Sequence, residues 1–313
     1  MHITPNLPVP VALTGCADYS EDAVRTAVRA ALDASGWRVG AGSRVLVKPN
    51  LLRAQSLACT NPRVVAEACS WIMEQGAKVV VADSPGFGSA VSVAAAVGLN
   101  EALRPLGLKV QDFDRPVPVP VPLPDGRSWG VARLALECDG ILSVPKVKAH
   151  SQMRLSLAIK NLFGCVCGLR KAMAHTIQGN RPGVFEDCLA ALCAALPPVA
   201  GLADGITAMH VTGPSGGQPY ALGCVGASAC AVALDTALYD VIGVTPKVVP
   251  VWSALVRRGL PQAVSENLVY PLRLPEDFPG RDFVLPLRLM DVSFSPHRLF
   301  WSLCRRLWLA YRS

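Results

Sequence analysis

Short apolar runs alternate with amphipathic segments along the first third of the chain. Residues 43–47 and 77–82 are apolar runs of strand length, and residues 108–113 form a third candidate strand. Between these runs, apolar residues recur every three or four positions, as on the buried face of a helix. This spacing predicts helices over residues 19–37, 60–75 and 89–106. Because strands and helices alternate, the pattern predicts an α/β fold with a mostly parallel sheet flanked by helices.

Basic residues gather after a fourth apolar run, at residues 140–144, which predicts another buried strand. Side chains of an extended chain alternate between its two sides. If the chain stays extended beyond this run, Lys146, Lys148 and His150 therefore point to the same side. The end of this strand then presents two ammonium groups and an imidazole together.

Residues 153–163 have the apolar spacing of a helix, and Lys160 lies on a face that leans toward His150. Glycines on both sides of Cys165 and Cys167 predict a tight loop after this helix. The basic side chains that follow the loop are those of Arg170, Lys171 and His175.

No acidic residue lies between Asp139 and Glu186, so the cationic groups of this stretch have no partner nearby in the sequence. One interpretation is an anion pocket in which His150 and His175 act as an acid/base or metal-binding pair. The other is a solvated basic face with two ordinary histidines.

Polar residues follow two of the earlier predicted strands. Lys48 and Asn50 come at the end of the first strand, and Asp83, Ser84 and Gly86 come at the end of the second. Open parallel sheets bind ligands at the carboxyl ends of their strands. These side chains are therefore candidates for ligand binding, and plain exits from strand to loop are the alternative.

Asp204 opens a predicted loop that ends in a glycine-rich stretch at residues 213–217. In the pocket its carboxylate would orient a lysine or a histidine, and a turn aspartate that bonds its own backbone is the alternative. The glycines permit a close approach of the backbone to a ligand. Residues 231–242 predict an apolar helix, on which we expect Asp235 to cap or pair structurally.

Composition narrows the choice of partner. Of the 313 residues, 51% are hydrophobic but only 6% are aromatic, which argues against a surface that stacks nucleic-acid bases. The net charge is +7, and residues 297–313 supply four arginines and no acid to it. The rest of the chain is therefore close to neutral, and we expect no nucleic-acid partner.

Eleven cysteines, an odd number without a repeating frame, are not typical of a secreted disulfide scaffold. Residues 1–10 contain three prolines and do not resemble a secretory signal. We therefore expect a cytoplasmic protein.

The C-terminal segment has its own pattern. At helical spacing, the arginines of residues 298–313 share one side and most apolar residues share the other. Such a basic amphipathic helix docks on a membrane surface, on a partner, or on the chain's own core. We expect an α/β domain at residues 1–245 that carries the site and an extension at residues 246–313.

Several motifs in this order resemble the domain of unknown function 362 family. They are residues 45–52 (VLVKPNLL), 81–86 (VADSPG), 146–150 (KVKAH) and 159–164 (IKNLFG), together with His175, Asp204-Gly205 and Gly213-Pro214. Members of this family are often fused to ferredoxin modules, which implies electron chemistry for some of them. This chain lacks the clustered four-cysteine signature, so the resemblance implies at most a ferredoxin-type partner as electron donor.

The order of histidine, lysine and histidine is also similar, more distantly, to that of the nickel-pincer lactate racemases. In that family a lysine anchors a pyridinium-derived nickel cofactor, one histidine is a base and another binds the metal. Carried over by motif, His150 resembles the base, Lys160 the anchoring lysine and His175 the metal ligand. The racemases have a further catalytic histidine in an early loop, where this chain has residues 83–86 without one. The resemblance therefore does not extend to a symmetrical two-base racemisation.

Three functions follow from these observations. The first is an enzyme that binds an anionic small molecule or a phosphorylated cofactor and transfers protons or electrons, as an oxidoreductase or an isomerase does. The second is a metal or iron–sulfur accessory protein, and the third is a non-catalytic ligand-binding module docked by its C-terminal helix to a membrane or a partner. The cofactor stays open among a metal ion, an iron–sulfur cluster and a pincer-type nucleotide.

The candidate site residues form three groups. The catalytic candidates are His150, Lys160, His175 and Asp204. The binding candidates are Lys48, Asn50, Asp83, Ser84, Gly86, Lys146, Lys148, Asn161, Arg170 and Lys171. The metal candidates are Cys165, Cys167 and His175.

Overall fold

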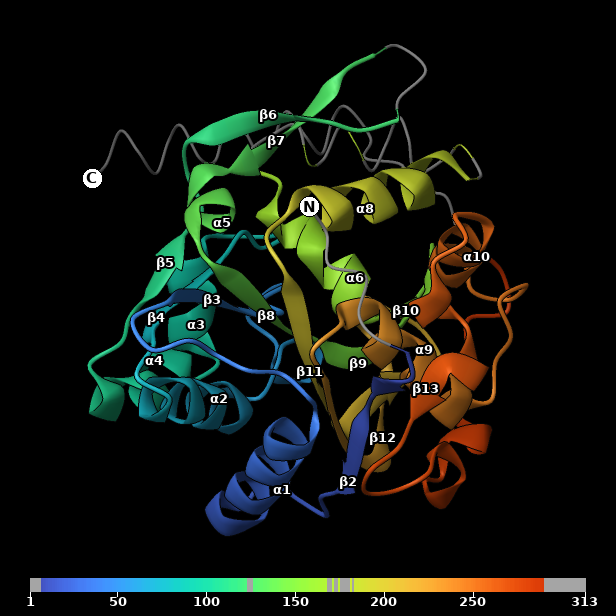
Figure 1. Cartoon of the computed structure of the whole chain (residues 1–313), viewed down its shortest axis with the longest axis horizontal. Helices are drawn as coiled ribbons and strands as arrows, with labels where there is room; N and C mark the ends of the chain where they lie inside the picture. The colour runs from blue at the N-terminus through green and yellow to red at the C-terminus, as the bar shows by residue number, and fades with distance from the viewer. Residues whose placement is uncertain are drawn as a thin grey trace.

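The computed structural model describes residues 7–122, 126–167, 171, 174, 181 and 183–289. A sheet of nine strands crosses this described part (Figure 1). Its strands are β2 (Ala12–Gly15), β3 (Arg44–Pro49), β4 (Lys78–Asp83), β5 (Val110–Asp112), β8 (Gly140–Val144), β9 (Lys146–His150), β10 (Arg154–Ser156), β11 (Val199–His210) and β12 (Gln218–Ser228). They follow the order β10-β9-β11-β8-β3-β4-β5, with β12 paired to β11 and β2 paired to β12.

The central pairs of this sheet are parallel, whereas β10, β12 and β2 join it antiparallel. β11 is long enough to pair with β8 through its first residues and with β9 through its later ones. Pro145, which lacks a backbone N–H, separates β8 from β9. The predicted α/β fold with a mostly parallel sheet is therefore confirmed.

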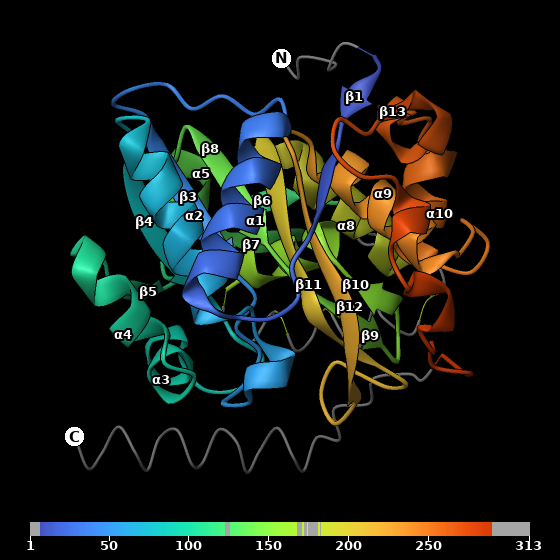
Figure 2. The same cartoon turned by 90° about the horizontal axis from the view of Figure 1, so that it is seen from below.

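Helices cover both faces of the sheet, and each face has its own apolar core. One face packs against α1 (Glu21–Ala34), α2 (Pro62–Glu74), α3 (Ala90–Ala96) and α4 (Leu99–Leu103). The other packs against α5 (Arg133–Glu137), α6 (Ala158–Asn161), α8 (Val184–Ala195), α9 (Ala231–Ile242) and α10 (Pro250–Arg257). Figure 2 shows α1 and α2 side by side in front of the sheet. Most strands are buried on both faces, which explains why they are continuous apolar runs.

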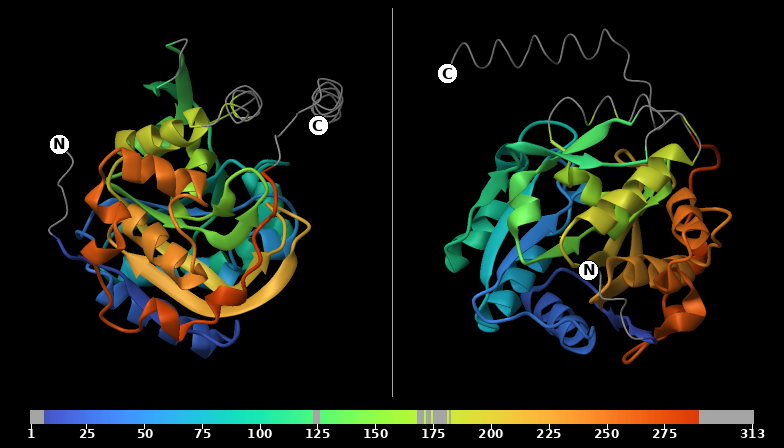
Figure 3. Two further views of the ribbon diagram at one scale, coloured as in Figure 1. Left: turned by 90° about the vertical axis from the view of Figure 1, so that its right-hand side faces the viewer. Right: turned by 45° about the horizontal axis from the view of Figure 1, so that its top comes forward.

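Two small sheets flank the large one. β6 (Pro116–Pro120) pairs with β7 (Ser128–Ala132) antiparallel, and this pair lies above the large sheet in Figure 1 and is seen from two further sides in Figure 3. β1 (Val9–Pro10) pairs in parallel with β13 (Leu268–Val269), so an early segment of the chain is joined to a late one there. The predicted boundary at residue 245 stays a prediction, and the predicted C-terminal helix lies outside the described residues.

Two predicted elements were wrong. Residues 153–163 do not form one helix, because Arg154–Ser156 pairs with β9 as β10 and leaves only the short α6 and the 3-10 turn η3 (Leu162–Cys165). Asp204 does not open a loop but lies inside β11, opposite Lys146 of β9 and Val225 of β12. In both places pairing with a neighbouring strand outweighs the local pattern.

The helix predicted at residues 89–106 is divided. α3 and α4 meet at Gly98, which has a φ of 81°. An α-helix cannot continue through a left-handed residue, so the chain turns there. By contrast, α2 begins as predicted, since Asn61 caps it by accepting a hydrogen bond from the backbone N–H of Arg63.

Asp235 has the structural role expected from the sequence. It lies on α9, is fully buried, and its two carboxylate oxygens accept hydrogen bonds from the backbone N–H groups of Ala158 (2.7 Å) and Ile159 (2.9 Å). These are the first two residues of α6, so a side chain of α9 satisfies donors that the helix itself cannot. Burial raises the pKa of Asp235 to about 7, with these hydrogen bonds opposing the shift.

We predict that Asp235→Ala lowers the free energy of unfolding by about 2 kcal/mol, because it leaves two buried N–H groups without acceptors. Asp240→Ala is the matched control, since Asp240 lies on the same helix and bonds only to the hydroxyls of Ser265 and Tyr270. That change should cost less than about 1 kcal/mol. Urea denaturation measures both, and equal losses would contradict the capping role.

Candidate functional site

A buried ion pair joins the carboxyl ends of β3 and β4. Lys48 Nζ lies 2.7 Å from Asp83 Oδ1, and the two residues are 0% and 1% exposed. The carboxylate of Asp83 also accepts hydrogen bonds from the backbone N–H groups of Leu51 and Ser84, each at 2.8 Å. Both oxygens of Asp83 are therefore already bonded within the protein.

Asn161 connects this ion pair to α6. Its side-chain oxygen accepts a hydrogen bond from Lys48 Nζ, and its amide nitrogen donates to the carbonyl of Lys48 and to Ser143 Oγ, all at 3.1 Å. Gly164 comes three residues after Asn161. A Cβ at Gly164 would lie 2.4 Å from both Lys48 Nζ and Asp83 Oδ1. The predicted tight loop is thus real at this position, because only glycine lets the chain pass over the ion pair.

A second buried ion pair lies between β9 and β11. Lys146 Nζ lies 3.0 Å from Asp204 Oδ2, and both side chains are almost fully buried. Tyr19 donates to Asp204 Oδ1 at 2.7 Å and accepts from Lys146 at 2.5 Å, while the backbone N–H of Asn61 donates to Asp204 Oδ2 at 2.8 Å. Asp204 therefore orients a lysine, as one of its two predicted roles required.

Three further lysines lie beside these pairs, and none of them forms an ion pair with an acid in the described part of the chain. Lys148 is 1% exposed and donates only to the carbonyl of Ala58, at 2.7 Å. Lys171 is partly buried and donates to the carbonyl of Ser84. Lys160 is 9% exposed and has no hydrogen bond or ion pair among the described residues.

Aromatic rings surround the Lys160 amine instead of acceptors. Its Nζ lies 5.0 Å from the ring centre of Phe163 and 5.6 Å from that of Phe185. Trp129 packs against both rings, so they belong to the apolar core. A ring face attracts a cation, but it replaces only part of the lost hydration.

Burial and mutual repulsion lower the pKa values of these three lysines. Burial contributes most, and lowers the pKa to about 7 for Lys160 and to about 8 for Lys148 and Lys171. Repulsion adds to it, from Lys171 on Lys160, from Lys146 on Lys148 and from Lys48 on Lys171, whereas attraction by Asp83 opposes the fall in pKa of Lys171 and Lys148. Such mutual influence requires that these lysines lie close together.

His150 lies in the same cluster as a neutral imidazole. Its Nδ1 accepts hydrogen bonds from the backbone N–H groups of Gln152 (3.1 Å) and Met153 (3.3 Å). Burial, and then the charges of Lys160 and Lys148, hold its pKa well below the usual value. With Nδ1 accepting, the proton must be on Nε2, so His150 offers a hydrogen-bond donor there and not a base.

The other candidates have different positions. Asn50 directly follows β3, and its side-chain oxygen is buried without a hydrogen-bond partner among the residues that the structure describes. Gly86 lies close to Leu52, since a Cβ there would meet that side chain at 3.2 Å. The glycine of the 213–217 loop that approaches another backbone most closely is Gly213, and it meets the carbonyl of Ala149 in β9 and not an open surface.

The metal candidates are only partly described. Cys165 and Cys167 are buried, and burial raises the pKa of their thiols to about 12 and about 11. Among the described residues, no group of three or more His, Cys, Asp or Glu side chains is arranged to hold a metal ion. His175 and Arg170 lie outside the described residues, so their roles stay predictions.

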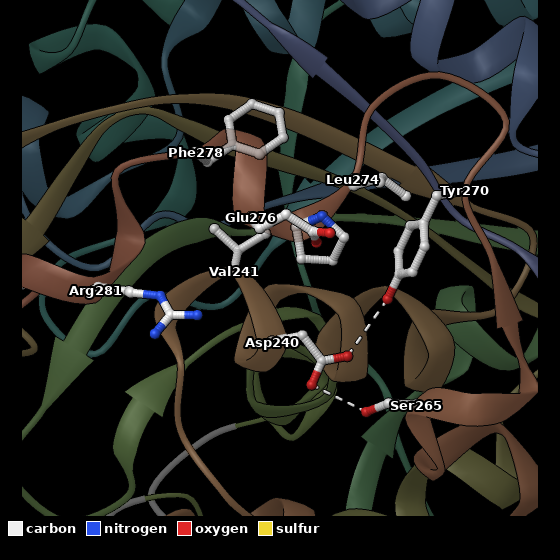
Figure 4. Close-up of a pocket in the computed structure, with 9 residues that line it drawn as sticks. Asp240, Val241, Ser265, Tyr270, Leu274, Glu276, Phe278 and Arg281 are labelled. Carbon is white, nitrogen blue, oxygen red and sulfur yellow. Dashed lines mark hydrogen bonds between the residues drawn. The ribbon is translucent and has the colours of Figure 1, made fainter.

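Two surface pockets lie apart from the lysines. The pocket in Figure 4 has a volume of about 390 Å³ and is lined by Asp240, Tyr270, Glu276, Phe278 and Arg281 among others. The second, of about 460 Å³, is lined by residues that follow β3 and β4, including Arg53 and Phe87. No candidate site residue lines either of these two pockets.

Sequence reasoning missed several residues that shape the site. Tyr19 is 185 residues from Asp204 in the chain, and no motif signals their contact. The carbonyl of Ala58 and the rings of Phe163 and Phe185 also had no local signal. Only the position of Phe163, three residues after Lys160 on a predicted helix, could have suggested its contact.

Fold and site together define an α/β protein with a basic cluster at the carboxyl edge of its sheet. Residues 45–240 match the family described as domain of unknown function (DUF362), which is more than half of the chain. The chain therefore belongs to this family, as its motifs indicated.

A relative is known by name. The chain is 32% identical over 310 residues to a thylakoid-associated protein of Synechocystis sp.. The matched region covers 96% of this chain and 95% of the relative. None of the helices in the described ranges combines the length and apolar character that crossing a bilayer requires.

Two solved structures are similar in part. One is the lactate racemase apoprotein from Thermoanaerobacterium thermosaccharolyticum, with a TM-score of 0.43 and 14% identity, covering 61% of this chain and 50% of that one. The other is a Thermotoga maritima protein, with a TM-score of 0.39 and 11% identity, covering 61% of this chain and 52% of that one. The chain thus spans about half the length of each of these two proteins.

We predict that Gly164→Ala destabilises the protein by about 3 kcal/mol, since the added methyl group must displace a buried ion pair. Gly140→Ala is the control, because a Cβ at Gly140 meets nothing closer than the carbonyl oxygen of Pro198 at 3.7 Å. It should change the stability by less than about 1 kcal/mol. Chemical denaturation compares the two variants, and similar values would show that the ion pair tolerates displacement.

Proposed function

We propose that this protein is an enzyme that binds an anionic small molecule beside Lys148, Lys160 and Lys171 and transfers a proton to or from it. One observation carries the proposal, which is that Lys148 and Lys160 are buried and Lys171 is partly buried without an ion pair to any acid among the described residues. A buried ammonium group without a partner costs several kcal/mol, so such a cluster is expected where a ligand supplies the missing negative charge.

Lys160 is the group that we assign to proton transfer. A pKa of about 7 means that its amine is present in both the neutral and the protonated form near neutral pH. A catalytic acid or base works best when its pKa lies near the working pH. The neutral amine would take a proton from the bound ligand and become an ammonium group, which the ligand's negative charge then stabilises.

His150 has a complementary role in this proposal. Its Nε2–H would donate a hydrogen bond to the ligand atom on which negative charge develops, and its low pKa keeps it neutral throughout. The base inferred for His150 from the racemase resemblance is thereby assigned to Lys160. Return of the proton from the Lys160 ammonium group to another atom of the ligand would complete an isomerisation, which needs no second substrate.

Lys160→Met tests the binding. We expect wild-type protein to bind sulfate in isothermal titration calorimetry, and this variant to bind it at least tenfold more weakly. Lys78→Met is the control, because Lys78 is exposed at the start of β4 and should leave the affinity unchanged. Unchanged sulfate binding in Lys160→Met would show that Lys160 is not part of an anion site.

The same variant should not lose stability. The pKa of Lys160 falls from 10.5 to about 7 on folding, so between these pH values the unfolded chain binds more protons. Stability from this group therefore rises with pH across that window, and at pH 7 the buried amine is destabilising. We expect Lys160→Met to raise the melting temperature at pH 7, with a smaller gain at pH 9. A large loss of stability would make Lys160 a structural residue.

The relative's name supports a separate proposal about location. Because that protein is thylakoid-associated, we propose that this chain also lies at a membrane surface, through the basic segment at residues 298–313. This segment lies outside the described residues, so the choice of this segment as the membrane contact rests on its sequence alone. Flotation with anionic lipid vesicles should recover the full chain and lose it when these residues are deleted. Equal recovery of both proteins would exclude the segment as the anchor.

A further inference from the structure

The charges around the three lysines can be counted element by element. β3 contributes Lys48, β4 contributes Asp83, and β11 contributes Asp204. The basic groups of β9 are Lys146, Lys148 and His150. α6 contributes Lys160, and Lys171 is the last of the described basic groups. Two further buried acids have partners elsewhere. Asp235 of α9 binds the backbone N–H groups of Ala158 and Ile159, and Glu186 of α8 has Asp187 and Arg257 as its electrostatic neighbours. The neighbouring thiols are Cys59, Cys165 and Cys167.

Both carboxylates are already used. Asp83 neutralises Lys48, and its remaining sites accept two backbone N–H groups. Asp204 neutralises Lys146 and accepts hydrogen bonds from Tyr19 and Asn61 as well. His150 is neutral. Lys148, Lys160 and Lys171 are therefore left without an ion pair among the described residues, and their direct contacts there are backbone carbonyls or aromatic rings. Asp83 attracts Lys148 and Lys171 from a distance, but its charge is already shared with Lys48.

The excess positive charge of these lysines can be removed in two ways. Without a ligand, a buried amine can lose its proton, which removes the charge but leaves a lone pair. With a ligand, negative charge next to the amines restores their protons and forms charge-assisted hydrogen bonds. A single negative charge balances only one of three amines, so the other two would stay neutral or unpaired.

We infer that the ligand of this cluster carries at least two negative charges, and that the buried lysines take up protons when it binds. The inference rests on the proposed function, because it specifies the anion that this same site binds. The ligand class is a phosphate ester, a dicarboxylate or another small anion of charge −2 or more, and monocarboxylates are excluded.

The linkage has a definite sign. The empty cluster has lost part of its protons near neutral pH, since the lysine pKa values are about 7 and 8. A bound dianion raises them again, so binding consumes protons from solution above pH 7. Affinity must therefore fall as the pH rises, by up to tenfold per pH unit for each proton taken up.

The experiment compares sulfate with acetate as probes in isothermal titration calorimetry of the full chain. Neither anion changes its charge between pH 7 and 9, so any proton that moves belongs to the protein. We expect sulfate to bind at least tenfold more tightly than acetate. Titrations at pH 7.5 in two buffers with different ionisation enthalpies should show about one proton taken up per sulfate. The sulfate affinity should fall at least tenfold from pH 7 to pH 9.

Lys148→Met provides the second measurement. It removes one surplus amine at a residue with no acidic partner, so the variant should fold, bind sulfate more weakly and take up fewer protons. Lys78→Met should match the wild type in both respects. Sulfate binding without proton uptake, or acetate binding as tight as sulfate binding, would overturn this inference and leave the anion site in place. No binding of either anion would overturn the proposed function itself.

Discussion

The ion pair between Lys48 and Asp83 is the constraint on which the rest of the site depends. Two opposite charges with no exposure to solvent are tolerated only when each finds a partner and every remaining hydrogen-bonding position is filled. Here those positions are filled by backbone N–H groups after β3 and β4 and by Asn161 from α6. The ends of two parallel strands, the loops after them and a helix on one face of the sheet are thereby fixed relative to one another.

The same constraint separates two kinds of lysine that look alike in the sequence. Lys48 and Lys146 are held by buried aspartates, and their charges organise the protein. Lys148, Lys160 and Lys171 have no such partner among the described residues, so their burial opposes folding. Unfavourable groups of this kind are normally kept where a protein acts. Lysines with and without a buried aspartate partner thus lie within a few residues of each other, which is the basis of the proposed function.

The sequence allowed a correct prediction of those features that depend on neighbouring residues in the chain. The alternation in β9 gave the common direction of Lys146, Lys148 and His150, and the Asn61 cap gave the start of α2. What could not be predicted depends on distant partners. Asp204 is in a strand because β9 and β12 pair on either side of it, and residues 154–156 are in a strand because β9 lies beside them.

In the candidate site, too, features set by neighbouring residues could be predicted, and features set by distant partners could not. Its lysines were visible as a run of basic residues without nearby acids, but which of them are neutralised was not. Lys48 meets Asp83 only because β3 and β4 are neighbours, and Lys146 meets Asp204 only because β9 and β11 are. The tautomer of His150 was also invisible, because it is set by two backbone N–H groups of the turn that follows the strand.

Gly164 has a consequence for how this protein family can vary. No side chain fits above Lys48 and Asp83 at this position. A substitution at one of the three residues therefore requires a compensating substitution at another. A relative with a larger residue at this position must also have a shorter or uncharged side chain in place of the lysine, the aspartate or both. The residues at these three positions should therefore change together among members of the family. Relatives without the ion pair are expected to have a different structure at this edge of the sheet.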